Sequence, residues 1–369
     1  MRWIIPLLLA GIYGLSGGPA AAAEAKVTQL LTGMDHPWSL AFLPQEDGML
    51  ITERPGRLRY WRPGQPLSAP VSGVPAVYAH GQGGLFDVVL APGFSQSRRV
   101  YLSYAEQGKD EAGTAVGYGR LSQDNTHLAD FKVIFRQQPK LSSGEHFGGR
   151  LAFDPQGFLY ISLGENNRRP TAQDLTKHQG KIIRLTAEGE IPPDNPFVHN
   201  ENARPEIWSL GHRNPQGLAL NPWSGAIWEN EHGPMGGDEV NIIAKGANFG
   251  WPIATYGINY SGLKIPEAQG GEVAGTVKPV WYWQKSPAIS GMAFYNAGRF
   301  PQWQHSLFIG ALKQKALLRL TLEGDRVVAE QRLLEDRGER IRDVRVGPDG
   351  FLYVLTDERN GKLLKVGLE

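Results

Sequence analysis

Polar side chains that could bind an anion stand beside short apolar runs at several separate places in the chain. They are His36, Gln82, Glu145, His146, His212, Arg213, Asn214, Lys313, Arg340 and Arg342. Taken singly, each is more often an ordinary polar residue bonded to backbone and water. Together they supply imidazole, amide and cationic groups, and guanidinium binds carboxylate through paired hydrogen bonds. If the fold brings them to one opening, we expect a pocket for a planar ligand with several negative charges: a cofactor, a stored ligand or a dianionic substrate.

A second chemically dense stretch spans residues 230–241 and reads NEHGPMGGDEVN. Its glycines leave backbone carbonyls accessible, and Asp238 and Glu239 are adjacent carboxylates. Hard oxygen ligands without cysteine suit calcium rather than zinc. A connecting loop with solvated acids is an equally good interpretation of these residues alone. His232 is more consistent with a packed side chain than with a metal ligand.

The elements that must position these residues form a repeat. An apolar run, a turn and a second apolar run recur six times, over residues 39–51, 87–103, 150–161, 217–228, 291–310 and 343–354. Each copy predicts two short strands, and residues 181–185 and 317–320 predict third strands. We therefore expect an all-β fold, a six-bladed β-propeller of four-stranded antiparallel blades, forming a single domain over residues 24–369. The polar residues that precede the first strands should then lie on one rim of the central channel.

Composition and the N-terminal residues exclude several classes of function and predict where the protein is located. The formal net charge of +1 gives no general attraction to nucleic acid. The chain has no cysteine, which excludes disulfides, c-type haem attachment and thiolate metal sites. Residues 1–23 have one arginine, an apolar stretch and a run of alanines, which predicts a signal peptide cleaved after Ala23 and export to the periplasm. A membrane anchor is the alternative, but glycines and a proline interrupt the apolar run, so no stable membrane insertion is expected.

Five separated motifs together resemble a known family. They are AHGQGGL at residues 79–85, EHFGGR at 145–150, GHRNPQG at 211–217, EHGP at 231–234 followed by GDE at 237–239, and IRDV at 341–344. In this order the chain resembles the soluble quinoprotein glucose dehydrogenases, most closely their aldose sugar dehydrogenase branch. The resemblance implies a six-bladed propeller that oxidises aldose sugars at the C1 hydroxyl to the lactone. It also implies two cofactors, pyrroloquinoline quinone and calcium.

The resemblance also implies roles for individual residues. His146 would remove the proton from the C1 hydroxyl while hydride passes to the quinone, and Arg213 would polarise the reduced cofactor. The implied cofactor-binding residues are Gln82, Arg213, Asn214, Tyr260, Ala311, Leu312, Lys313, Arg340, Ile341 and Arg342. The carbonyls of Gly233 and Pro234 would hold the calcium that polarises the quinone. Glu239 and the carbonyl of Phe249 would hold a second, structural calcium.

Two departures from the family pattern affect these expectations. Glu145 stands where the glucose dehydrogenases carry aspartate beside the catalytic histidine, so the orienting role of that aspartate is not carried over to Glu145. The segment from Trp251 to Pro287 is shorter than in those enzymes. Its aromatic residues are candidates for sugar contact or ordinary core residues: Tyr256, Tyr260, Trp281 and Trp283.

Two functions from other classes compete with the dehydrogenase. A calcium-dependent lactonase or other propeller hydrolase would need acidic ligands projecting into the channel, whereas the rim here is cationic. A non-catalytic propeller binding module is the second. The dehydrogenase reading adds a partner, an electron acceptor, because a reduced quinone must pass its two electrons onward.

Overall fold

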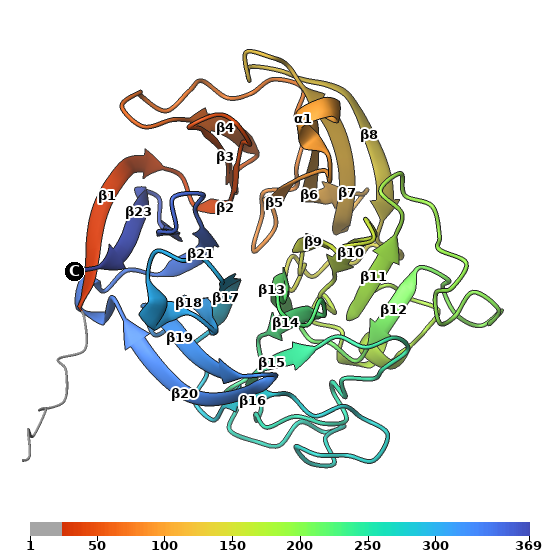
Figure 1. The fold of residues 1–369 in the computed structure, drawn as a ribbon. Helices are drawn as coiled ribbons and strands as arrows, with labels where there is room; N and C mark the ends of the chain where they lie inside the picture. Colours follow the sequence, from red (N-terminus) through yellow and green to blue (C-terminus); the bar gives the residue numbers. More distant parts are fainter. Residues whose placement is uncertain (1–23) are drawn as a thin grey trace, which may run out of the picture.

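The computed structural model describes residues 24–369, which form six antiparallel sheets arranged as a ring around a central axis (Figure 1). The all-β six-bladed propeller is therefore confirmed. The predicted signal peptide lies outside the described residues. No helix in residues 24–369 is long and apolar enough to cross a membrane.

Each blade is built from strands that follow one another in the chain. The blades are β2 (Pro37–Phe42), β3 (Met49–Glu53), β4 (Arg57–Trp61); β5 (Leu85–Leu90), β6 (Arg99–Gln107), β7 (Ala112–Leu121), β8 (Leu128–Arg136); β9 (Leu151–Phe153), β10 (Leu159–Ser162), β11 (Lys181–Leu185), β12 (Ile207–Leu210); β13 (Pro215–Leu220), β14 (Ile227–Glu231), β15 (Asp238–Ile242), β16 (Trp281–Trp283); β17 (Ile289–Tyr295), β18 (Ser306–Ala311), β19 (Ala316–Glu323), β20 (Arg326–Leu333); and β21 (Ile341–Val346), β22 (Leu352–Thr356), β23 (Gly361–Leu368). The remaining regular segments are α1 (Phe94–Ser97) and 3₁₀ turns at Arg169–Gln173, Pro301–Trp303 and Glu335–Arg337.

The last blade takes its outer strand from the other end of the chain. Strand β1 (Ala25–Met34) pairs antiparallel with β23, with Val27 opposite Val366, and gives the sheet order β1-β23-β22-β21. The ring is thus closed by hydrogen bonds between its two ends, which leaves no blade without a neighbour.

One blade departs from the prediction of four strands, because β2, β3 and β4 form a three-stranded sheet. An irregular segment takes the place of the fourth strand: the backbone N–H groups of Ser68 and Val71 donate to the carbonyls of Tyr60 (3.0 Å) and Leu58 (2.7 Å). Pro66 and Pro70 lie within this segment. Proline cannot donate to a strand ladder, which explains why the segment is not a regular strand.

The core lies between blades. Leu50 and Leu58 of the first blade pack with Leu85, Val88 and Leu102 of the next. Middle strands such as β3, β10 and β22 are buried along their whole length, which is why the sequence shows continuous apolar runs there rather than strict alternation. The first strands of successive blades contact one another around the axis. This rigid inner ring positions the loops that carry the polar residues.

Candidate active site

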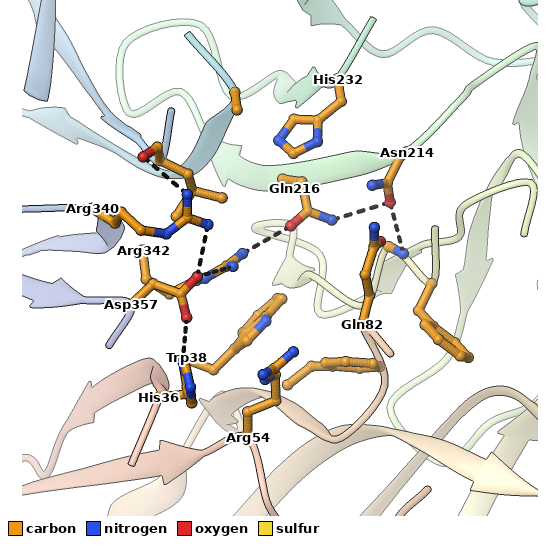
Figure 2. Close-up of a pocket in the computed structure, with 15 residues that line it drawn as sticks. His36, Trp38, Arg54, Gln82, Asn214, Gln216, His232, Arg340, Arg342 and Asp357 are labelled. Carbon is orange, nitrogen blue, oxygen red and sulfur yellow. Dashed lines mark hydrogen bonds and ion pairs between the residues drawn. The ribbon is translucent and has the colours of Figure 1, made fainter. Parts of the chain in front are cut away.

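A cavity of about 340 Å³ opens at one rim of the ring. Six residues singled out from the sequence line it: His36, Gln82, Asn214, Leu312, Arg340 and Arg342. They come from the starts of the innermost strands and from the end of β18 (Figure 2). Trp38, Phe86 and Phe147 add aromatic walls. The expected convergence of polar residues on one opening is thus present for this part of the set.

The cavity holds more positive than negative charge. Arg54, Arg340 and Arg342 line it together with one carboxylate, Asp357. The Asp357 carboxylate accepts hydrogen bonds from Arg342 (2.8 Å) and Arg340 (3.2 Å) and lies 3.2 Å from Nδ1 of His36 (Figure 2). Burial alone would raise the pKa of Asp357, but Arg342, His36 and Arg340 hold that pKa well below its usual range. The surplus cationic charge suits an anionic ligand.

His146 is held by a carboxylate that sequence reasoning missed. Its Nδ1 lies 2.8 Å from Oε1 of Glu165, and both side chains are buried. The other carboxylate oxygen of Glu165 accepts a hydrogen bond from the backbone N–H of Arg168. An ionised carboxylate can only accept, so in the neutral imidazole Nδ1 carries the proton and Nε2 is the acceptor. The Glu145 carboxylate, by contrast, contacts Asn167 at 3.1 Å, so the carboxylate that lies against the His146 ring is that of Glu165.

The backbone around His146 ties it to the cavity. The His146 N–H donates to Oε1 of Gln82 at 2.9 Å, and the Gly148 N–H donates to Oδ1 of Asn214 at 3.3 Å. Phe147 and Gly148 line the cavity wall, whereas His146 does not. Within residues 24–369, Nε2 of His146 has no hydrogen-bond partner.

His232 is the second histidine at the site. Its ring lines the cavity, and Nε2 hydrogen-bonds the carbonyl of Ile289. Burial lowers the pKa of His232 to about 3, and Arg213 adds to this effect. It is therefore a neutral, packed side chain, as the sequence analysis favoured, although it also faces the cavity.

The other candidate residues lie elsewhere on the rim. Ala311 and Ile341 are buried within β18 and β21, and Lys313 is exposed. Tyr260 is 71% exposed on the long β15–β16 connection. Tyr256, on the same connection, stacks on Tyr282 with ring centroids 3.8 Å apart. The structure does not bring these residues to the wall of the main cavity.

Arg213 lines a second, smaller cavity, which shares the lining residue His232 with the first. Arg213, Gly233, Glu239 and Phe249 surround a cavity of about 10 Å³, roughly the room needed by one water-sized sphere. Arg213 Nη1 donates to the carbonyl of Gly233 at 2.8 Å. A Cβ at Gly233 would lie 2.2 Å from the Gly236 carbonyl, so glycine is required for this turn. Burial raises the pKa of Asp238, which accepts from the Gly233 N–H, to about 6.

Buried carboxylates gather beside this space on one face of β14 and β15. Glu229 lies opposite Asn241 in the ladder and Glu231 opposite Glu239. His212, Glu229 and Glu231 each place a ligand atom within 4.8 Å of the others. Oε1 of Glu229 and Oδ1 of Asn241 have no hydrogen-bond partner among the described residues. Burial, together with repulsion from Glu231, raises the pKa of both Glu229 and Glu239. The two unpartnered oxygens and the neighbouring Glu239 carboxylate are of the ligand type that a hard cation such as calcium prefers.

Comparison with known proteins places the chain in a family. The family model for glucose/sorbosone dehydrogenases matches residues 34–365. The chain belongs to this family. It is 66% identical over 348 residues to the aldose sugar dehydrogenase YliI of Escherichia coli (strain K12), covering 94% of each chain. The resemblance inferred from the five motifs is therefore confirmed, and the family member is an oxidoreductase of the dehydrogenase class, as expected.

Solved structures of relatives agree with this family. The soluble aldose sugar dehydrogenase from Escherichia coli in the apo-form superposes with a TM-score of 0.92 at 65% identity, covering 94% of this chain and 100% of that one. The PQQ-bound form of aldose sugar dehydrogenase from Streptomyces coelicolor superposes with a TM-score of 0.76 at 28% identity, covering 94% of this chain and 99% of that one.

Proposed function

We propose that the protein oxidises aldose sugars at the C1 hydroxyl to the lactone, with pyrroloquinoline quinone and calcium as cofactors. The observation that carries this proposal is the cavity in which three arginines face a single carboxylate, next to a histidine whose Nε2 is an acceptor. Family membership and a PQQ-bound relative of the same fold support it. The cationic wall argues against a hydrolase that holds its metal on acidic channel residues.

The cavity fits a flat tricarboxylate quinone on the chemistry of its lining. Arg54, Arg340 and Arg342 offer charge-assisted hydrogen bonds to carboxylates. Gln82, Asn214 and Leu312 supply amide and backbone groups along the same wall, and the rings of Trp38 and Phe86 can pack against a planar ligand. On this proposal, Tyr260, Lys313, Ala311, Ile341 and Arg213 complete the binding site from the rim.

The chain's own residues handle the proton. Glu165 accepts the hydrogen bond from Nδ1 of His146, so Nε2 takes the proton of the C1 hydroxyl as the C1–O bond becomes a carbonyl. The quinone, when bound, supplies the two-electron acceptor for the hydride that leaves C1. Arg213 places a guanidinium near the site to stabilise negative charge that develops there. The hydrogen bond from the His146 N–H to Gln82 fixes the base relative to the cavity.

Two groups of residues would hold calcium. Gly233 and Pro234 would offer main-chain carbonyls beside the cavity. The Gly233 carbonyl already accepts from Arg213, but its second lone pair remains available. Glu239 and the Phe249 carbonyl would hold the structural ion, and the unpartnered oxygens of Glu229 and Asn241 fit such an ion. Calcium at the first position would act as a Lewis acid.

We further propose that residues 1–23 direct export to the periplasm, that residues 24–369 form the single catalytic domain, and that an electron acceptor is the partner.

The test of the proposed function is reduction of an artificial electron-acceptor dye by purified protein over an aldose panel, with and without the quinone and calcium. The expected result is turnover only when both are present, lost in His146→Ala. Quinone binding without turnover on any aldose would show the substrate class to be wrong, and absence of quinone binding would refute the cofactor assignment. Hydrolysis of lactones instead would favour the hydrolase.

A further inference from the structure

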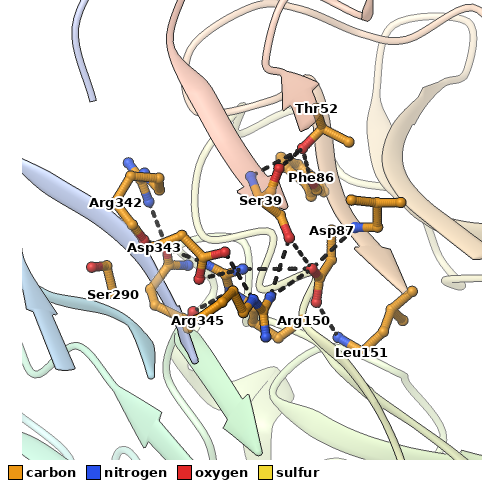
Figure 3. Close-up of polar contacts among 12 residues, drawn as sticks. Ser39, Thr52, Phe86, Asp87, Arg150, Leu151, Ser290, Arg342, Asp343 and Arg345 are labelled. Carbon is orange, nitrogen blue, oxygen red and sulfur yellow. Dashed lines mark hydrogen bonds and ion pairs between the residues drawn. The ribbon is translucent and has the colours of Figure 1, made fainter. Parts of the chain in front are cut away.

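An ionic cluster of two arginines and two aspartates lies among the innermost strands of the ring, next to residues that line the cavity (Figure 3). Ser39, Asp87 and Asp343 directly follow the cavity-lining residues Trp38, Phe86 and Arg342. Arg150, which precedes β9, and Arg345 of β21 place two guanidinium groups between the two carboxylates. We call Arg150, Arg345, Asp87 and Asp343 the axial cluster.

Arg150 is buried and contacts both carboxylates of the axial cluster. Its side chain is 1% exposed. Nη1 lies 3.2 Å from Asp343 Oδ1 and 3.5 Å from Asp87 Oδ1, as ion contacts rather than aligned hydrogen bonds. Arg345 pairs with the same two carboxylates at 3.0 and 3.1 Å. Two cations and two anions therefore balance in a buried site, and no further ion is needed there.

The same guanidinium supports the cavity from below. Nε of Arg150 donates to the carbonyl of Gln216 at 2.7 Å, and Nη2 donates to the carbonyl of Arg342 at 3.2 Å. Its Cζ atom lies 3.9 Å from the ring centroid of Trp38. Trp38, Gln216 and Arg342 belong to three different blades, and all three line the cavity. One side chain thus connects three separate parts of the cavity wall.

We propose that Arg150 is a positioning residue that sets the mutual placement of Trp38, Gln216 and Arg342, and through them the geometry of the cofactor pocket. The effect on cofactor binding rests on the proposed function, whereas the placement of Trp38, Gln216 and Arg342 by Arg150 does not depend on that function. Arg342 reaches Gln216 Oε1 at 3.1 Å and Asp357 at 2.8 Å, so a shift of the Arg342 backbone would disturb both contacts.

Lysine cannot replace this arrangement. An ammonium group is a single point charge, whereas the planar guanidinium donates in two directions while its face lies on an aromatic ring. Space is equally specific: a Cβ at Gly291, from the fifth blade, would lie 1.9 Å from Asp343 Oδ1 and 2.7 Å from Nη2 of Arg150. The absence of a side chain at Gly291 is what allows the axial cluster to form.

Two variants, Arg150→Lys and Arg150→Met, test the proposal against Arg184→Met. Arg184 is a matched control because it is also buried and stacked, on Phe158 at 3.8 Å and Trp208 at 4.6 Å, and it pairs with Asp194, yet it does not line the cavity. Crystal structures of the folded variants without cofactor measure the positions of Trp38, Gln216 and Arg342. Equilibrium titration with pyrroloquinoline quinone, followed by tryptophan fluorescence, measures affinity, and thermal unfolding measures stability.

We expect both Arg150 variants to shift the three cavity residues and to weaken quinone binding by about tenfold or more, because displacements near 1 Å already disrupt a site. Arg184→Met should lower the unfolding temperature without changing either quantity. Unshifted cavity residues in Arg150→Lys would overturn the inference whatever the affinity. If the wild-type protein binds no quinone, the proposed cofactor is wrong, and the crystal structures alone decide the positioning role. Arg150→Lys keeps the charge, so it provides the answer if Arg150→Met does not fold.

Discussion

Replacing Glu165 by glutamine should invert the tautomer of His146. One carboxylate oxygen of Glu165 accepts from the Arg168 N–H and the other from Nδ1 of His146. In Glu165→Gln, the single amide oxygen must stay on the Arg168 N–H, because the amide NH₂ cannot face another donor. The NH₂ group then points at His146, donates to Nδ1 and leaves the proton on Nε2. The variant loses the acceptor that the proposed reaction needs.

The size of the loss follows from comparable chemistry. In hydrolytic triads, replacing the carboxylate by its amide lowers turnover about 10⁴-fold through the wrong histidine tautomer. We expect about 10³-fold here, or ~4 kcal/mol of transition-state stabilisation, because the glutamine can rotate at the cost of the Arg168 contact. The assay is the rate of dye reduction at saturating sugar. Nitrogen-15 NMR of labelled histidine reports the tautomer directly, without cofactor.

Glu145→Gln is the matched control. Glu145 is adjacent to His146, but its carboxylate contacts Asn167 at the surface. We expect a change of less than about fivefold, since exposed polar contacts contribute ~1 kcal/mol at most. A loss below about tenfold in a correctly folded Glu165→Gln protein, with its tautomer unchanged, would refute the reasoning.

Three further outcomes follow from the site. Asp357→Asn should reduce the free energy of unfolding by about 3 kcal/mol at pH 7, because it breaks a buried ionic cluster. Because the pKa of Asp357 is lowered in the folded state, its contribution to stability is present above the ordinary aspartate pKa of about 4 and declines as the pH falls below that value. Denaturant unfolding of both proteins at pH 7 and pH 3 measures this. An equal stability difference between wild type and variant at the two pH values would contradict the prediction. Calcium at about 100 times its Kd should stabilise the wild-type protein against unfolding by ~2.7 kcal/mol, and it should not stabilise Glu239→Gln. The control is Glu272→Gln, which changes an exposed carboxylate paired with Lys278 and should respond to calcium like the wild type. A thermal-shift assay measures all three proteins. Arg54→Gln should weaken quinone binding about tenfold and reduce its salt dependence, as expected for loss of a charge-assisted contact; Arg120→Gln on the exposed face of β7 is the control, and equal effects of the two would assign the loss to net charge alone.

The sequence predicted the ring of six blades and the site residues that lie at the start of the first strands. Apolar runs repeat because each blade buries its inner strands on both faces, so residues 150–161 and 343–354 could be assigned to β9, β10, β21 and β22. Polar residues at the start of the first strand were found for the same reason in five of the six blades, all except the fifth. The prediction of four strands in every blade was wrong for the first blade, because a proline-containing segment takes the place of the fourth strand and donates two backbone hydrogen bonds to β4.

The site residues that the sequence analysis missed share one position in the repeat, the end of the second strand of a blade. Arg54 and Asp357 directly follow the second strands β3 and β22, and Glu165 follows the second strand β10. In an antiparallel pair, the end of the second strand lies beside the start of the first. The same rim therefore receives residues from both places, and after second strands the sequence analysis considered only those of the fourth and fifth blades, such as Lys313. The contribution of the long β15–β16 connection, with Tyr256 and Tyr260, depends on packing that no repeat encodes.

Closure of the ring by β1 and β23 has a consequence for the timing of folding. The first strand to be synthesised cannot pair until the last one exists, since Ala25 lies opposite Leu368. This pairing spans almost the whole chain, and contacts of such long sequence separation form slowly. Five blades can assemble from neighbouring segments, while the sixth must wait for two distant ones. The Glu369 N–H and the Glu24 carbonyl lie 3.3 Å apart, so a short peptide could join them. A circular permutant opened in the β4–β5 connection would make the slow step local, and it should reach the same ring faster.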